Sequence, residues 1–140
     1  MEYDVVIVGG GPSGLATAIK LKQLNADVNV CVLEKVAEIG SHILSGNVFE
    51  TRALDELVPN WKDLNAPIKT KVTKEKFLFL GKKSSFSWPT WLLPKVQQNH
   101  KNYIISLANL CRWLAEQAEA LGAEIFSGFP ASEILYNEDG

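Results

Sequence analysis

The sequence has little cysteine, no excess of positive charge and no long apolar run. Cys31 and Cys111 are far apart and form no Cys-x-x-Cys pair, so neither a zinc site nor a redox dithiol is indicated, and we expect both to be core residues. Lysine and arginine number 14 against 16 acidic residues, a formal net charge of −2, and there is no basic stripe. This balance argues against nucleic acid as a partner. No apolar run is long enough to cross a bilayer.

The two ends of the chain give further expectations. The first four residues lead directly into an apolar run, so we expect no signal peptide and a reducing, cytoplasmic setting. A length of 140 residues suits one small domain or part of a larger one, and 46% hydrophobic residues provide a core. The sequence ends on Asp139–Gly140, a hairpin-turn dipeptide that no second strand follows. We therefore expect a piece of a longer protein.

Residues 5–35 predict a compact βαβ unit. The run VVIV at 5–8 is typical of a parallel strand that is buried on both faces. Residues 13–24 have helical spacing, and residues 28–33 form a second strand that ends at Glu34. The expected inner side of the helix consists of Leu15, Ala18, Ile19 and either Leu21 or Lys22.

The second half of the fold follows after an insertion. Residues 107–121 predict a helix that ends at Gly122, and strands are expected at 123–126 and 132–136. Residues 37–102 contain four of the six prolines, a predicted loop up to about residue 50, a short helix with Leu54, Leu57 and Val58, and a hairpin over 77–88. The expected fold is α/β, an incomplete Rossmann-like domain of residues 1–36 and 103–140 with residues 37–102 inserted.

A glycine pattern follows the first strand, Gly9-x-Gly11-x-x-Gly14. Gly9 permits a tight turn, Gly11 lets a pyrophosphate approach the backbone, and Gly14 lets the helix pack close to the strand. The helix N-terminus offers N–H groups and a partial positive charge to phosphates. Glu34 ends the second strand, where a carboxylate accepts hydrogen bonds from a ribose diol. Together, strand, turn, helix and acid predict a dinucleotide site rather than a structural turn.

The position of the insertion favours FAD over NAD. An NAD domain usually passes from its second strand through a short helix to the third, whereas about 70 residues intervene here on approximate boundaries. A flavin ring needs such a covering layer. Glu34 also disfavours NADP, because a carboxylate repels a 2′-phosphate.

Several stretches carry a family resemblance. They include YDVVIVGGGPSGLATAIKLKQL, GSHILSG, ELVPNWK, NHKNYII and WLAEQAEALGAEI, and with shorter pieces they cover nearly the whole chain. The sequence resembles the N-terminal part of the electron transfer flavoprotein–ubiquinone oxidoreductases, within the FAD proteins of the glutathione-reductase type. The resemblance implies an FAD enzyme that takes electrons from reduced electron transfer flavoprotein and passes them to ubiquinone. It also implies a [4Fe–4S] cluster whose cysteine ligands lie in a C-terminal part that is absent here.

The resemblance assigns cofactor roles by position and no catalytic acid or base. Glycines 9, 11 and 14 face the pyrophosphate, Glu34 the ribose and Lys35 the adenosine half, while Ala131 places its backbone at the adenine. The segment from His42 to Gly46 runs toward the flavin. An arginine expected at position 106 is a serine here, and either Arg112 substitutes for it or the contact is missing. The full set of expected cofactor-binding residues is Gly9, Gly11, Pro12, Ser13, Gly14, Glu34, Lys35, His42, Ser45, Gly46, Arg112 and Ala131.

The stretch FLFLGKKSSFSWPTWLLPK combines tryptophan, leucine and lysine, as interfacial anchors do. From the residues alone, a buried hairpin is the favoured interpretation. The resemblance reverses this, because the family lies on the membrane surface and draws quinone from it. We therefore expect Trp88, Trp91, Leu92 and Leu93 to be exposed. The expected location is peripheral, on the cytoplasmic face of an inner membrane, or on the matrix face of the mitochondrial membrane in a eukaryote.

Two other functions stay open. One is a flavin-dependent reductase or monooxygenase of the same fold, similar to geranylgeranyl reductases. The other is a partial nucleotide-binding module without turnover, because the chain lacks the second half of an FAD domain. On either view we expect the isolated chain to be inactive and to retain FAD weakly. No metal site is predicted.

Overall fold

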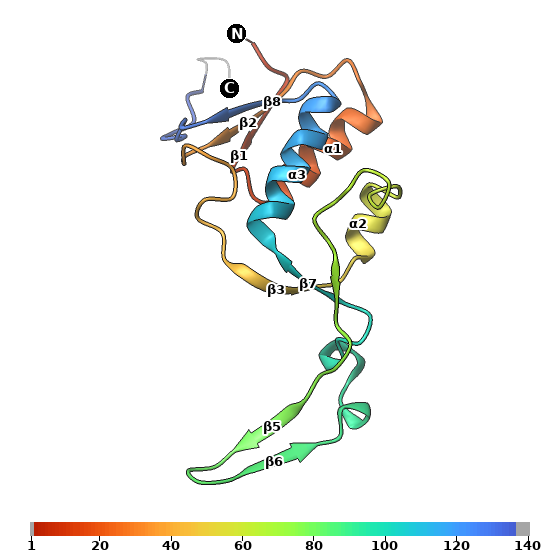
Figure 1. Ribbon diagram of the computed structural model, residues 1–140. Coiled ribbons are helices and arrows are strands. Elements are labelled where there is room, and N and C mark those ends of the chain that lie inside the picture. The colour runs from red at the N-terminus through yellow and green to blue at the C-terminus, as the bar shows by residue number, and fades with distance from the viewer. Residues whose placement is uncertain (1, 137–140) are drawn as a thin grey trace. The chain divides into compact units, whose positions relative to one another are not determined.

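The computed structural model describes residues 2–136 and divides into two compact units (Figure 1). Unit 1 comprises residues 1–45 and 106–140, and unit 2 comprises residues 46–105. The expected insertion covered residues 37–102, so the contact-based boundaries lie nine and three residues further along the chain.

Unit 1 is built on a parallel sheet. Strands β1 (Val5–Val8), β2 (Val30–Glu34) and β8 (Glu124–Ser127) have the order β1-β2-β8, with Val5 opposite Val30 and Cys31 opposite Glu124. Helices α1 (Pro12–Leu24) and α3 (Leu107–Ala120) lie side by side against this sheet (Figure 1). The βαβ pattern and the third parallel strand confirm the predicted α/β, Rossmann-like class.

The core of unit 1 lies between the two helices and the sheet. Its buried side chains are Leu15, Ala18 and Ile19 of α1, Leu110, Cys111, Leu114 and Ala118 of α3, and Val30, Cys31 and Val32 of β2. Burial raises the pKa of the Cys31 thiol and raises that of Cys111 to about 11. Both cysteines are thus buried, free thiols in the core, as expected.

Lys22, rather than Leu21, completes the inner side of α1. Its Nζ donates hydrogen bonds to the carbonyl oxygens of Ala26 at 2.6 Å and Val28 at 3.1 Å. A buried ammonium needs such acceptors, and they come from the turn that joins α1 to β2. The aliphatic stem can therefore lie in the core while the charge is satisfied by backbone.

Unit 2 contains a small mixed region and an antiparallel hairpin. Strands β3 (Ser45–Phe49), β7 (Tyr103–Ser106) and β4 (Thr70–Lys71) have the order β3-β7-β4. Helix α2 (Arg52–Leu57) follows β3. Strands β5 (Phe77–Leu80) and β6 (Ser85–Trp88) form the predicted hairpin, and two short 3-10 turns follow, η1 (Thr90–Leu92) and η2 (Lys95–Gln97).

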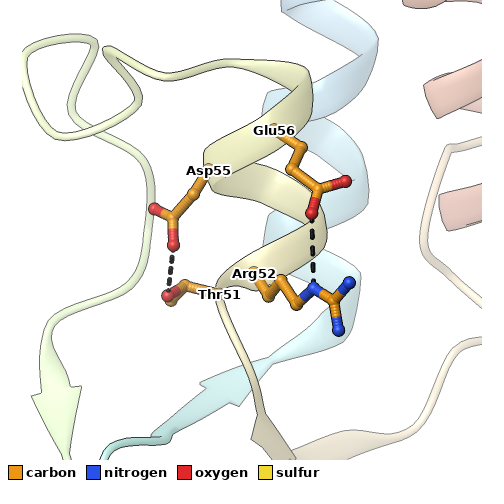
Figure 2. Close-up of polar contacts among 4 residues, drawn as sticks. All are labelled: Thr51, Arg52, Asp55 and Glu56. Atoms are coloured by element: carbon orange, nitrogen blue, oxygen red, sulfur yellow. Dashed lines mark hydrogen bonds and ion pairs between the residues drawn. The ribbon is translucent and has the colours of Figure 1, made fainter.

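Helix α2 has a polar contact with the buried indole of Trp61. The carboxylate of Asp55 accepts hydrogen bonds from Trp61 Nε1 at 2.7 Å and from Thr51 Oγ1 at 2.9 Å. Figure 2 shows Asp55 pointing toward Thr51 and Glu56 toward Arg52. Arg52 Nε lies 3.3 Å from Glu56 Oε1. These contacts hold the start of α2 and the chain after it together.

Three sequence-based expectations are wrong. Strand β1 was expected to be buried on both faces, but Val6 and Val8 are 53% and 68% exposed, because α1 and α3 pack side by side on one face of this sheet. Residues 45–49 were expected in a loop but form β3, because strand pairing rather than apolar alternation defines the segment SGNVF. Residues 132–136 were expected as a strand, but they have no regular structure. Their apolar side chains, Ile134, Leu135 and Tyr136, are more than three-quarters exposed, so no core within residues 2–136 fixes that segment. The predicted turn at 139–140 lies outside the described residues.

Over residues 2–136, no helix has the length and apolar character needed to span a membrane.

Candidate nucleotide-binding site

The glycine turn between β1 and α1 has the geometry that its sequence predicts. Gly9 has a φ of +106°, a conformation that glycine adopts without strain, and its N–H donates to the carbonyl of Leu33 at 2.8 Å. A Cβ on Gly14 would collide with the carbonyl oxygen of Gly9, so the absence of a side chain lets α1 approach β1. A Cβ on Gly11 would meet nothing within 4 Å, which leaves the surface of the turn open.

The first turn of α1 carries no negative charge of its own. Gly11 is the N-cap, Pro12 occupies the first helical position, and the first turn contains no acidic residue. Pro12 and Ser13 are exposed. A helix N-terminus with this composition favours an anion such as a diphosphate.

Glu34 is fixed beside the turn by backbone donors. Its Oε2 accepts a hydrogen bond from Gly10 N at 2.7 Å, and its Oε1 accepts one from Val36 N at 3.1 Å. A Cβ on Gly10 would collide with Ile39 Cδ1 and crowd Glu34, so a side chain at this position would require Ile39 to shift. Sequence analysis missed Gly10, although the run of three glycines was the available signal.

The environment of Glu34 favours its ionised form. Partial burial acts to raise the pKa of Glu34, but the N–H groups of Gly10, Val36 and Lys35 and the Lys35 ammonium outweigh it, and the net pKa is lowered. The carboxylate is therefore ionised at neutral pH. Each oxygen has a further lone pair with which to accept a hydrogen bond from a hydroxyl group.

A slot of about 200 Å³ lies at the carboxyl ends of the three parallel strands. Ligands of open α/β sheets bind at this edge. The slot brings together predicted residues from three segments, and its lining is Val8, Gly9, Leu33, Glu34, Lys35, Phe129, Pro130 and Ala131. A hollow of about 420 Å³ beside α2 is larger. Its lining contains three carboxylates, Glu50, Asp55 and Glu56, against the two cations Arg52 and Lys101, so its net charge is negative and less suited to a diphosphate.

Phe129 is the aromatic wall that sequence analysis missed. Its backbone N donates to the carbonyl of Glu34 at 2.9 Å, which ties the chain after β8 to the end of β2. Its ring packs edge-on against Phe126, with centroids 5.8 Å apart, and Phe126 packs in the same way against Tyr3. Gly128, with a φ of +81°, forms the turn before Phe129. A glycine directly after the predicted strand was the available sign that the chain turns back here.

Other predicted residues do not line the slot. His42 is exposed in the loop after Gly40, and Ser45 and Gly46 are exposed at the start of β3. Ser106 is the N-cap of α3, where its Oγ accepts a hydrogen bond from Asn109 N at 3.4 Å. Arg112 is exposed, and its Nη1 donates to Asn109 Oδ1 at 2.8 Å.

The described residues contain no cluster of three or more histidine, cysteine, aspartate or glutamate side chains that could hold a metal ion. The arrangement suits binding of a nucleotide diphosphate. The open turn and helix N-terminus provide an anion site, the Glu34 carboxylate provides acceptors for ribose hydroxyls, and Phe129 provides an apolar surface for a base. An adenine dinucleotide such as FAD presents these three parts in that order, so the residues present fit its ADP half.

Comparison with known proteins confirms the predicted resemblance. The chain is 54% identical over 145 residues to an electron transfer flavoprotein-ubiquinone oxidoreductase of Pseudomonas aeruginosa, covering 100% of this chain and 26% of the relative. It is 53% identical over 143 residues to the mitochondrial protein of that name from Dictyostelium discoideum, covering 99% and 23%. The chain thus spans about a quarter of the length of these relatives. Residues 1–63 also match the Thi4 family.

Solved structures share the fold. A geranylgeranyl bacteriochlorophyll reductase-like protein from Thermoplasma acidophilum has a TM-score of 0.68 at 24% identity, covering 97% of this chain and 32% of that one. A flavoprotein/dehydrogenase from Cytophaga hutchinsonii has a TM-score of 0.62 at 18% identity, covering 98% and 33%. At these identities the likeness concerns the fold alone.

Proposed function

We propose that this chain is the N-terminal, nucleotide-binding part of an FAD-dependent oxidoreductase that passes electrons from electron transfer flavoprotein to ubiquinone. The observation that carries the proposal is the Glu34 carboxylate, held by Gly10 N and Val36 N beside an open glycine turn. The identity of more than half of the aligned residues to ubiquinone oxidoreductases supports the substrate class.

The ADP half of FAD would occupy the turn and the slot. The N–H groups of Gly11, Ser13 and Gly14 at the start of α1 hold the diphosphate. Gly9 and Pro12 shape the turn, since Gly9 N and Gly10 N already donate to Leu33 and Glu34 and Pro12 has no N–H. Glu34 accepts hydrogen bonds from the ribose hydroxyls, and Lys35 lies beside it on the slot wall. The base packs against Phe129, near the backbone of Ala131.

The flavin-side assignments extend this proposal. His42, Ser45 and Gly46 face the flavin, and Arg112 provides the positive charge that Ser106 does not. Arg112 can do so because its partner Asn109 is neutral and exposed, so the contact is easily exchanged. When bound, FAD supplies the electron-transfer chemistry, and the protein's task is to bind and orient it. A [4Fe–4S] cluster would be held by cysteines elsewhere in the full protein.

A membrane surface is the proposed source of ubiquinone, and unit 2 carries the proposed contact. Trp88, Trp91 and Leu92 are exposed, at 40%, 76% and 51%, whereas Leu93 is half-buried. Exposed tryptophan and leucine side chains next to lysines are typical of interfacial anchors. The protein would be peripheral, on the cytoplasmic face of an inner membrane or the matrix face in mitochondria.

A chimera tests the electron-transfer proposal. In the Pseudomonas aeruginosa relative, the segment that aligns with this chain is replaced by this sequence. The chimera should contain FAD and reduce ubiquinone with electrons from reduced electron transfer flavoprotein. The same chimera with Gly11→Asp should lose FAD and serves as the control.

The same assay weighs a second candidate function. The alternative is a flavin-dependent reductase or monooxygenase, and the fold shared with a reductase-like protein is compatible with it. A chimera that contains FAD but is reduced by NADPH, and not by electron transfer flavoprotein, would support that alternative and overturn the leading proposal. The isolated chain is expected to be inactive in both assays.

The membrane contact has its own test. Flotation with liposomes compares the chain with its Trp91→Asp/Leu92→Asp variant, and the variant should float less. Equal flotation of the two proteins would show that Trp91 and Leu92 do not form the membrane contact.

A further inference from the structure

We propose that residues 69–101 select an anionic bilayer surface, so that this chain prefers anionic over zwitterionic membranes although its own net charge is negative. The inference rests on the membrane contact proposed above and deepens it by naming the charge of the headgroups.

The two units differ in the sign of their charge. Residues 46–105 contain ten lysines and arginines against five acidic residues, a net charge of +5. The remaining residues of unit 1 contain four basic against eleven acidic residues, a net charge of −7. The overall value of −2 therefore hides a strongly basic unit, and a bilayer that attracted the chain as a whole by charge would have to be cationic.

The positive charge of unit 2 is concentrated around the hairpin. Residues 69–101 contain one acidic residue and eight exposed lysines: Lys69, Lys71, Lys74, Lys76, Lys82, Lys83, Lys95 and Lys101. None of the eight forms an ion pair with a carboxylate in the described part of the chain. The one acid, Glu75, accepts a hydrogen bond from Asn99 N at 2.9 Å. The lysines are thus available to an external anion.

The hairpin between these lysines has two different faces. Phe77 lies opposite Trp88 and Phe79 opposite Phe86, which places four aromatic rings on one face. These rings form edge-on contacts, with centroids 5.3 Å apart for Phe77 and Phe79. The other face carries Leu78 and Leu80 opposite two serines. The side chains of all four aromatic residues are at least 37% exposed.

The combination favours a bilayer over an acidic protein partner. Nine large apolar side chains are exposed in this segment: Phe77, Leu78, Phe79, Leu80, Phe86, Trp88, Trp91, Leu92 and Val96. Lys82 and Lys83 occupy the turn of the hairpin, and Lys95 and Lys101 follow its second strand. Rings at headgroup depth with cations at both ends describe a segment that lies along an anionic interface.

The test is sedimentation of the chain with vesicles of phosphatidylcholine, with or without phosphatidylglycerol. Binding to the anionic vesicles should be stronger than binding to the zwitterionic ones. In about 0.5 M salt it should fall toward the zwitterionic level, because charges are then screened within several ångströms. Each lysine near an anionic surface contributes about fivefold in affinity, so Lys82→Gln/Lys83→Gln should weaken anionic binding roughly 25-fold. Lys82→Arg/Lys83→Arg and Lys20→Gln in α1 are matched controls and should bind as the unaltered chain does.

Three results would overturn the inference. Equal binding to both vesicle types would show that the chain does not select anionic headgroups, although it contacts the membrane. Binding to neither would remove the contact as well, and ADP binding by the same sample would show that the nucleotide proposal stands. Normal vesicle binding by the lysine-to-glutamine variant, together with lost binding to electron transfer flavoprotein, would reassign the surface to a protein partner.

Discussion

Two glycines of the turn differ in whether they tolerate a side chain. Gly14 faces the carbonyl oxygen of Gly9, so Gly14→Ala forces α1 away from β1 and should cost about 1–3 kcal/mol of unfolding free energy, the range for overpacking. Gly11 faces open space in an extended conformation, with φ −82° and ψ 179°. Because aspartate is a better N-cap than glycine, Gly11→Asp should keep or increase stability while its charge repels a diphosphate.

Thermal denaturation and ADP titration of the two variants measure this contrast. Gly14→Ala should melt at a lower temperature, whereas Gly11→Asp should melt at or above the unaltered temperature and show no ADP binding. A Gly11→Asp variant that binds ADP normally would show that the phosphates lie elsewhere.

Glu34 should couple nucleotide binding and stability to pH. Its pKa is lowered in the folded state, so its stabilising contribution is complete above the unfolded value near 4.5 and is lost as pH falls through the lower, folded value. Glu34→Gln keeps the shape but loses the charge, and should weaken ADP binding about tenfold or more, since a hydrogen bond to a charged group contributes roughly 1.5–3 kcal/mol. Urea unfolding between pH 3 and 7 should also show a shallower acid dependence for the variant; identical profiles would mean that Glu34 is not held as described.

Most single-residue roles in the turn could be predicted, because the spacing of glycines indicates where the backbone needs a positive φ or a close approach. Gly9 and Gly14 have the geometry expected of them, while Gly10 was missed because its constraint comes from Ile39, 29 positions away along the chain. Position 106 was expected to hold an arginine. Its serine instead caps α3, a local task that the sequence pattern at a helix start indicates.

At the scale of elements, α2 provides a test of the polar contact beneath it. The hydrogen bonds from Trp61 and Thr51 lower the pKa of Asp55. The Asp55 contribution is therefore present above its usual pKa and is lost as pH falls through the lowered one. Asp55→Asn should reduce the stability of unit 2 at neutral pH and change the fluorescence of Trp61. Asp63→Asn, at an exposed position outside this contact, should do neither. The measurement is tryptophan fluorescence during acid titration, and equal titrations for the two variants would contradict it.

Helices and parallel strands of unit 1 were predictable, but the short strands of unit 2 were not. Helix α3 shows strong apolar spacing that matches its buried side. In β1 the β-branched run predicted the strand but not its burial, because Val6 and Val8 are exposed. β3 and β4 have exposed or half-buried residues throughout and exist through pairing with β7. For residues 132–136 the prediction failed in the opposite direction. Their apolar pattern predicted a strand, but without a surface to pack against the segment forms none.

At the scale of the whole molecule, nucleotide and membrane binding are assigned to different units and should be separable. Phe79→Ser, on the aromatic face of the hairpin, should weaken vesicle binding at least tenfold. It should leave ADP affinity unchanged, since Phe79 and the glycine turn belong to separate compact units and share no contact partner among the described residues. Gly11→Asp should do the opposite. Parallel vesicle sedimentation and ADP titration of both variants check this, and a variant that loses both activities would show that the sites are coupled.

The sequence could predict the glycine turn and the acid beside it, because the spacing of glycines and an acid at the end of β2 are local signals. The overall charge of −2 conceals the separation of charge between the units. That separation becomes visible only when the chain is divided: the predicted insertion of residues 37–102 already contains ten basic against six acidic residues. The slot wall at Phe129 likewise depends on how the chain after β8 returns to the end of β2.

The central claim is that the turn after β1 and the acid ending β2 grip the ADP half of FAD. An amide-resolved NMR titration of the 140-residue chain with ADP tests it most directly. The largest shifts should fall on residues 9–14, 34–36 and 129–131, and FMN, which lacks the adenosine, should not reproduce them. Shifts confined to residues 46–105, or none at saturating ADP, would contradict the account.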